Sequence, residues 1–216
     1  MKLRRIALMS ILAAGLSACG SADLASRNIS PEAATVIDGS QYTAKAAMYN
    51  VQDLRVNVPR TLVVSEANLF YPGGDIVWRA EPYGDRYAQV QAIFTEGLGR
   101  GAARLKSGPE VIVDVEVVRF HSLSEKARYT TGGVHNMIFN MAILDAETGA
   151  VIQPAQEYKI DLDAFGGRRA FRAERQGQTQ RVRVTDRLAH FMIDTLSAPV
   201  SGPLAEAAVA RRANGI

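Results

Sequence analysis

The feature that most restricts the fold of this chain is an alternation of valines near its middle. Val111, Val113, Val115 and Val117 occupy every second position, and acidic residues fill two of the positions between them. Side chains at every second position of a β-strand point to the same face of the sheet. The alternation therefore predicts a strand with one strongly apolar face, which has to be covered by a second layer.

Two further segments extend the predicted sheet. Residues 137–144 are apolar on nearly both faces, which is typical of a central strand. Residues 145–149 form a predicted hairpin turn, in which Gly149 can adopt a positive φ. Val151 and Ile152 resume the strand, and the alternation of Tyr158, Ile160 and Leu162 with polar residues predicts the next one. Shorter strands are predicted at residues 54–58, 61–64 and 76–78.

Two helices are predicted to supply the covering layer. One begins after Asp85, whose carboxylate can cap it, and continues to about residue 105; the other spans residues 179–196. Apolar and small residues at helical spacing mark the inward face of each helix. They are Tyr87, Val90, Phe94, Gly97, Leu98, Gly101 and Leu105 in the first, and Val182, Leu188, Ala189, Met192 and Leu196 in the second. This order of elements predicts an α+β fold, a mainly antiparallel sheet with two helices packed on one face.

The first 18 residues have the organisation of a secretory signal peptide. Lys2, Arg4 and Arg5 precede an apolar run of about 11 residues, whereas a membrane-spanning helix needs about 20. Without residues 1–18 the chain carries 22 basic and 22 acidic residues, so the net charge of +3 comes from this segment. The charge balance therefore gives no support to a nucleic-acid partner, and none is predicted.

The segment Leu16-Ser17-Ala18-Cys19 resembles the bacterial lipobox. The resemblance implies that Cys19 is the first mature residue and carries a diacylglycerol and an N-acyl chain; no other cofactor is expected. Cys19 is the sole cysteine, so no disulfide is available to stabilise the fold. Gly20 and Ser21 follow in place of aspartate, which implies the periplasmic face of the outer membrane. An ordinary signal peptide with a chance cysteine is the alternative.

Four segments divide the chain in this interpretation. Residues 1–18 are the signal peptide, and residues 19–45, rich in serine, alanine and asparagine, form a lipidated tether. Residues 46–198 form a single α+β periplasmic domain, long enough to bury a sizeable core. Residues 199–216 are a flexible C-terminal tail.

Two patterns that suggest chemistry have simpler interpretations. The glycines of Gly97-Leu98-Gly99-Arg100-Gly101 lie late in a predicted helix with no strand immediately before them. Close packing of the helix on the sheet, or a frayed helix end, is therefore predicted rather than a phosphate-binding loop. His121 and His135 flank a predicted hairpin and could approach each other, with Asp114 or Glu116 as a carboxylate. Their spacing matches no metal site, so no catalytic residue and no metal ligand is predicted.

The charge distribution supplies the candidate binding residues. Residues 19–167 carry 13 basic and 18 acidic residues, whereas residues 168–187 carry seven arginines and two acidic residues. Guanidinium groups bind carboxylates and phosphates through paired hydrogen bonds. We therefore expect an acidic partner protein or an anionic lipid head group here; the alternative is a solvated loop and a polar helix face that offset the acidic remainder. The predicted contact residues are Arg168, Arg169, Arg172, Arg175, Arg181 and Arg183.

Residues 61–196 resemble an uncharacterised family of alphaproteobacterial lipoproteins. The resemblance rests on residues 61–67 (TLVVSEA), 75–79 (DIVWR), 111–116 (VIVDVE), 133–136 (GVHN) and 178–186 (QTQRVRVTD). The family has no assigned activity, so the resemblance implies no catalytic residue. The order of strands and helices is also similar to that of auxiliary lipoproteins of envelope transport systems, which is a likeness of topology only.

These observations favour a non-enzymatic lipoprotein that is anchored in the membrane by its lipid and binds an envelope protein, as a binding or scaffold component of a transport or assembly system. A protein that binds lipid or another small amphiphile in a groove is one alternative. A hydrolase-type enzyme using His121 and His135 is another. A filled core with an exposed patch near the arginine segment would favour the first.

Overall fold

The computed structural model describes residues 45–199. The predicted signal peptide, Cys19 and nearly all of the predicted tether and tail lie outside the described residues. Within that range no helix has both the length and the apolar character needed to cross a membrane. In chain order the elements are β1 (Lys45–Ala47), β2 (Asn50–Asn57), β3 (Ile76–Val77), α1 (Arg86–Ala102), β4 (Glu110–His121), α2 (Glu125–Arg128), β5 (Gly133–Asp145), β6 (Val151–Ala164), α3 (Gly167–Arg175), α4 (Gln180–Thr195) and β7 (Ser197–Pro199).

The main sheet has the strand order β2–β4–β5–β6, and β3 pairs with β4 beyond the end of β2. The neighbours β4, β5 and β6 are antiparallel, whereas β2 and β3 run parallel to β4. The sheet is therefore mixed at one edge and antiparallel elsewhere. A separate two-stranded antiparallel sheet joins β1 to β7, so the first and last described segments lie side by side.

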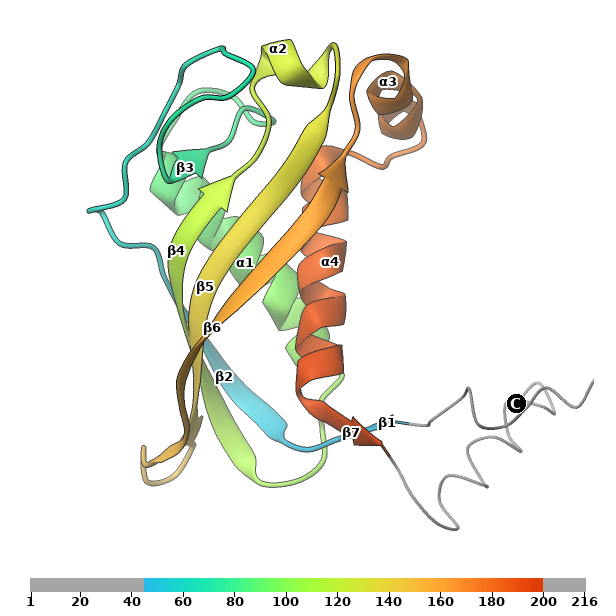
Figure 1. Cartoon of the computed structure of the whole chain (residues 1–216). Coiled ribbons are helices and arrows are strands. Elements are labelled where there is room, and N and C mark those ends of the chain that lie inside the picture. Colours follow the sequence, from blue (N-terminus) through green and yellow to red (C-terminus); the bar gives the residue numbers. More distant parts are fainter. Residues whose placement is uncertain (1–44, 200–216) are drawn as a thin grey trace, which may run out of the picture. The chain divides into compact units, whose positions relative to one another are not determined.

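The helices α1 and α4 lie side by side on one face of the main sheet (Figure 1). Asp85 caps α1 as predicted, since its carboxylate accepts hydrogen bonds from the backbone nitrogens of Tyr87 and Ala88 at 3.0 and 3.2 Å. Thr179 caps α4 in the same way through Val182. The alternating valines of β4 are fully buried under this layer. The predicted α+β fold, with two helices on one face of the sheet, is confirmed.

Aromatic side chains fill the space between the sheet and the helices. Phe94 of α1 meets Phe120 of β4 and Phe139 of β5 edge to face, with ring centroids 6.0 and 5.3 Å apart. Trp78 packs on Phe120 in the same manner at 5.4 Å. Such pairs contribute about 0.5–1.5 kcal/mol each beyond the area they bury. The interior is therefore occupied by the chain's own side chains.

The two glycines of α1 that face α4 let the helices approach closely. A Cβ atom at Gly97 would lie 2.7 Å from the Cβ of Leu188, and one at Gly101 would lie 2.5 Å from the carbonyl oxygen of Ala189. Neither position can accept a side chain without separating the helices. The packing interpretation of these glycines is confirmed, with a helix rather than the sheet as the neighbour.

Several local predictions are wrong. Residues 61–64 are not a strand: Val64 makes an isolated bridge to Ile76, and the loop between β2 and β3 is held instead by the Asp75 carboxylate, which accepts from the nitrogen of Val63 at 2.9 Å. Local β propensity was overridden because this segment has no neighbouring strand along its length.

The inward face of α4 is also shifted from the prediction. Val182 and Ala189 are only half-buried, whereas Val184 and Thr185 are buried together with Leu188. The shift arises because α4 packs against α1 as well as the sheet. The short elements α2, α3, β1 and β7 were not predicted at all.

Candidate functional site

The arginine-rich segment forms a helix at one end of the domain rather than the loop considered above. α3 lies beyond the end of β6, at the opposite end from β1 and β7 (Figure 1). Ala170 and Ala173 provide its buried side. The connection to β6 passes very close to the turn before β5, since a Cβ atom at Gly166 would lie 2.0 Å from the nitrogen of Gly132. An ion pair between Glu174 and Arg128 of α2 also holds the helix.

The six predicted contact arginines separate into two sets, and half of them have partners within the domain. Arg181 forms ion pairs with Glu81 and Glu96. Arg169 forms an ion pair with Asp163 at 3.0 Å, and its guanidinium lies 3.7 Å from the ring centroid of Phe165. Arg183 donates a hydrogen bond of 2.6 Å to the carbonyl of Asp163, and its guanidinium lies 3.5 Å from the centroid of the same ring.

The other three arginines, Arg168, Arg172 and Arg175, are exposed on α3. No ion pair involves them within residues 45–199. They border an open depression of about 500 Å³ together with Phe171 and Gln176. Among the described residues, three of the six predicted arginines therefore have an ion-pair or hydrogen-bond partner, and the other three form no ion pair.

Aromatic side chains accompany these arginines. Phe171 projects from α3 with 48% of its surface exposed, and it stacks on Tyr129, which is 50% exposed, with ring centroids 5.5 Å apart. The guanidinium of Arg128 lies 5.5 Å from the ring of Tyr129. We call Tyr129, Arg168, Phe171, Arg172 and Arg175 the arginine surface. Sequence reasoning found its arginines but not its aromatic members.

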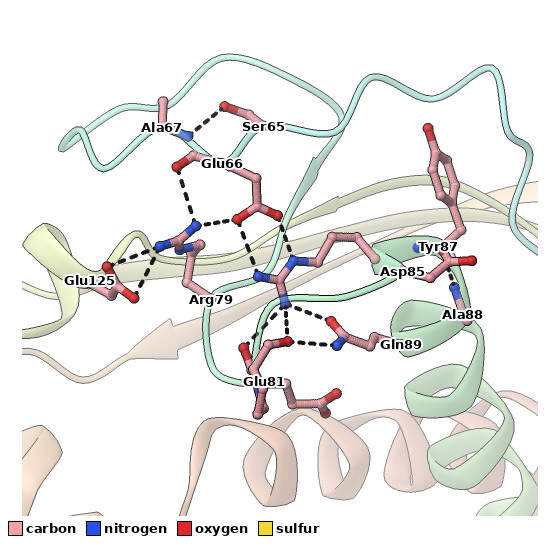
Figure 2. Close-up of polar contacts among 12 residues, drawn as sticks. Ser65, Glu66, Ala67, Arg79, Glu81, Asp85, Tyr87, Ala88, Gln89 and Glu125 are labelled. Atoms are coloured by element: carbon pink, nitrogen blue, oxygen red, sulfur yellow. Dashed lines mark hydrogen bonds and ion pairs between the residues drawn. The ribbon is translucent and has the colours of Figure 1, made fainter.

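A network of ion pairs that was not predicted from the sequence joins the loop between β2 and β3 to the starts of α1 and α2 (Figure 2). Glu66, in the loop between β2 and β3, accepts hydrogen bonds from both Arg79 and Arg86; the Arg86 Nε distance is 2.7 Å. Arg79 also binds Glu125, the first residue of α2, at 3.2 Å. We call Glu66, Arg79, Arg86 and Glu125 the ion-pair cluster. It ties the loop to the start of α1 and of α2.

Arg86 is the most enclosed member of the ion-pair cluster, with 4% of its surface exposed. Its Nη1 atom donates to the carbonyls of Glu81 and Pro82 and to Gln89 Oε1, the last at 2.7 Å. Hydrogen bonds from Arg86, and then from Arg79, lower the pKa of Glu66 below its ordinary value. The charges of the cluster are thus satisfied internally. No spacing in the sequence could have found them, because the members come from separate segments.

His121 and His135, which the sequence suggested could approach each other, lie on opposite faces of the sheet. His121 pairs with Asn136, the neighbour of His135, so the two rings point in opposite directions. His121 Nε2 donates to the Pro72 carbonyl at 2.8 Å, whereas a hydrogen bond of 2.7 Å links His135 Nδ1 to Ser122 Oγ. Burial, assisted by Arg183 and Arg128, lowers the pKa of His135 to about 3.

This arrangement does not assemble an acid–base or metal site from the histidines. Asp114 and Glu116 are exposed and point to the face of the sheet opposite His135. They therefore cannot form one site with that histidine. Among the described residues, no group of three or more histidine, cysteine or acidic side chains is arranged to hold a metal ion. His121 and His135 do not approach each other, because successive residues of a strand point to alternate faces of the sheet.

Comparisons with known proteins identify a family but no activity. A family model described as "Family of unknown function (DUF6778)" matches residues 49–212. No curated protein matches the chain.

Solved structures resemble the chain only weakly. They include protein XCC0632 from Xanthomonas campestris (8% identity, TM-score 0.40, covering 72% of this chain and 88% of that one). A PelC dodecamer from Paraburkholderia phytofirmans (15%, 0.31, 72% and 94%) and a minor lipoprotein from Acinetobacter baumannii (12%, 0.30, 68% and 91%) are also similar. Every one of these TM-scores is below 0.5, so no role is transferred from them.

Proposed function

The chain belongs to DUF6778, a family of unknown function, and we propose that it is a lipid-anchored, periplasmic, non-enzymatic binding protein. Cys19 carries the lipid, and the arginine surface holds an envelope protein that works in transport or assembly. The single observation that carries this proposal is the arginine surface itself, where three arginines that have no ion pair with any described residue lie beside two half-exposed aromatic rings.

The composition of the arginine surface is that of a protein-binding site. Arginine and aromatic residues are enriched in protein interfaces and among the residues that contribute most of the binding energy. Arg168, Arg172 and Arg175 can each form two parallel hydrogen bonds with a carboxylate. Arg169, Arg181 and Arg183 were predicted to contribute as well, and each of them already has a partner within the domain.

The anchor is proposed from the lipobox-like segment 16–19. Acyl chains contribute about 0.8 kcal/mol per buried methylene, and stable anchoring needs more than one chain. Diacylglycerol plus an N-acyl chain on Cys19 meets this requirement. Gly20 and Ser21 support the outer membrane as the location.

The two alternatives have less support from the structure. An amphiphile-binding protein needs an apolar groove between the sheet and the helices, and Phe94, Phe120 and Phe139 occupy that space. A hydrolase based on His121 and His135 needs their rings on one face of the sheet, and they lie on opposite faces.

The anchor is tested by membrane fractionation and by mass spectrometry of the N-terminal peptide. We expect the protein in the outer-membrane fraction, with the mass of a triacylated Cys19 peptide, and we expect the Cys19→Ala protein to be released. An unmodified Cys19 in the mature protein would refute the anchor.

Partner binding is tested by crosslinking in cells followed by purification. The double variant R168E/R172E should lose a stoichiometric envelope partner that the unaltered protein retains. Its matched control is R104E/K106E, which makes the same change of charge at exposed residues that precede β4. Equal recovery of the partner with both variants would refute a role for the arginine surface.

A further inference from the structure

We infer that the arginine surface is one half of a larger docking surface, whose other half is the loop 69–71, and that its occupant is an acidic protein segment carrying apolar side chains. This inference rests on the proposed function and deepens it. We call the combined surface the apical surface. Its members are Leu69, Phe70, Tyr71, Lys126, Tyr129, Arg168, Phe171, Arg172 and Arg175.

The two halves are joined through α2. Ser124, which caps α2, donates from its hydroxyl to the carbonyl of Leu69. The backbone nitrogen of Lys126 donates to Asn68 Oδ1 at 2.7 Å. From the other end of α2, Arg128 reaches Glu174 of α3. The loop, α2 and α3 all lie at the end of the domain away from β1 and β7 (Figure 1).

Exposed apolar side chains occur on both sides of α2. Tyr71 is 93% exposed, and Leu69 and Phe70 are also exposed. The Lys126 ammonium lies 4.7 Å from the ring centroid of Phe70, just as Arg128 lies beside the ring of Tyr129. A cation therefore lies beside an aromatic ring on each side of α2, and on the second side the ring of Tyr129 continues into that of Phe171. Exposed apolar groups gathered beside polar ones mark interaction sites more often than isolated apolar residues do.

The charges of the apical surface specify the kind of partner. Lys126, Arg168, Arg172 and Arg175 make no ion pair within the described residues, whereas the acidic residues Glu125 and Glu174 are already paired. These unpaired cations favour a partner of negative charge. The exposed rings require that partner to bring apolar side chains as well.

The surroundings of the apical surface favour a protein occupant. The described chain begins at Lys45, in β1, at the end opposite the apical surface (Figure 1). The apical surface therefore does not adjoin the first described residues. Its exposed aromatic rings and arginines are the residue types enriched in protein interfaces, and its cations without an ion pair in the described residues favour an acidic segment.

The first part of the test places a photocrosslinking amino acid at Tyr71 or at Phe171 of the full-length protein in cells. We expect both positions to capture the same protein, although they lie on opposite sides of α2. Capture at each should fall at least tenfold with R168E/R172E and remain within twofold with R104E/K106E. Peptide mapping should place the captured segment in a region with an excess of aspartate and glutamate.

The second part uses defined probes with the mature Cys19→Ala chain. A fluorescent peptide that alternates glutamate with leucine and phenylalanine should bind, and the same peptide with lysine in place of glutamate should not. The variant F70S/Y71S should weaken binding about fivefold, and raising the salt concentration should weaken it further. Circular dichroism of each variant verifies that the fold is retained.

The contrary outcomes separate the two proposals. Capture at Phe171 but not at Tyr71 would leave the arginine surface as a binding site and overturn the composite surface. Binding to phosphatidylglycerol vesicles but not to the acidic peptide would overturn the protein occupant in favour of lipid. Capture of a second copy of this chain would overturn a separate acidic partner. Retention of the partner by R168E/R172E, to the same extent as by the control R104E/K106E, would overturn the proposed function itself.

Discussion

Two groups of arginines in this domain have opposite surroundings. Arg79 and Arg86 are enclosed by carboxylates and backbone carbonyls in the ion-pair cluster (Figure 2), whereas the three arginines of the arginine surface have no ion pair within the described residues. The side chain is the same in both groups, so its neighbours decide its role. Enclosed arginines should contribute to stability and little to binding, and exposed ones should do the reverse.

The largest effect is expected from Arg86→Ala. This change removes one of the two arginines that donate to Glu66, and it leaves the carbonyl of Glu81 without its side-chain donor in a partly buried site. Removing one member of a buried ion pair costs about 3–5 kcal/mol, and we expect about 3 kcal/mol because Glu66 is partly exposed to water. The free energy of unfolding in urea measures this loss. A change below about 1 kcal/mol would show that water replaces the guanidinium, and the contrast between the two groups would fail.

A smaller effect is expected from Glu66→Gln, about 1–2 kcal/mol at neutral pH, because the amide still accepts a hydrogen bond but carries no charge. The folded-state pKa of Glu66 is lowered, so its contribution is present above the unfolded value near 4.5 and is lost as the pH falls below it. The difference in stability between the two proteins should therefore shrink below pH 4.5. The unaltered protein and the Glu66→Gln variant both contain His135, so the titration of this histidine affects the stability of each equally.

Arg181→Ala should lower the free energy of unfolding by about 1 kcal/mol. This effect lies between those expected for the ion-pair cluster and for the arginine surface. The ion pairs of Arg181 with Glu81 and Glu96 are only partly shielded from water, and such pairs are weak. Thermal unfolding of the variant gives the loss, and high salt should reduce the difference from the unaltered protein. Loss of the partner without loss of stability would instead return Arg181 to the binding residues, as predicted from the sequence.

The smallest effect on stability is expected from the triple variant R168A/R172A/R175A, within about 0.5 kcal/mol. These side chains are exposed, and no ion pair in residues 45–199 depends on them. The midpoint of urea unfolding should be unchanged while partner binding is lost. A destabilisation above about 1.5 kcal/mol would show that the arginines of α3 are structural, like those of the ion-pair cluster.

The regular elements followed from local patterns. The valine alternation located β4, and helical spacing located α1 and α4. Asp85 caps α1 as predicted, and Thr179, predicted as the first residue of α4, is its N-cap. The α2 and α3 helices were missed because they are short and carry few apolar residues. Residues 61–64 were assigned to a strand because the sequence shows β propensity but not the absence of a neighbouring strand.

The candidate site was predictable only in part. The excess of arginine in residues 168–187 was visible as composition, and it led to six candidates of which three are exposed without an internal ion pair. Phe171 and Tyr129 had no sequence signal that linked them, since they lie on α3 and after α2. The ion-pair cluster was hidden for the same reason.

The sequence by itself determined the α+β architecture, because periodicity in a strand or helix is a property of neighbouring residues and follows from the geometry of the backbone. It also carries the lipobox-like segment that leads us to propose an anchor at Cys19. Only the tertiary structure decided which arginines are enclosed and which are exposed. Ion pairs and aromatic contacts form between side chains brought together from distant segments, and no local pattern records which charges will meet.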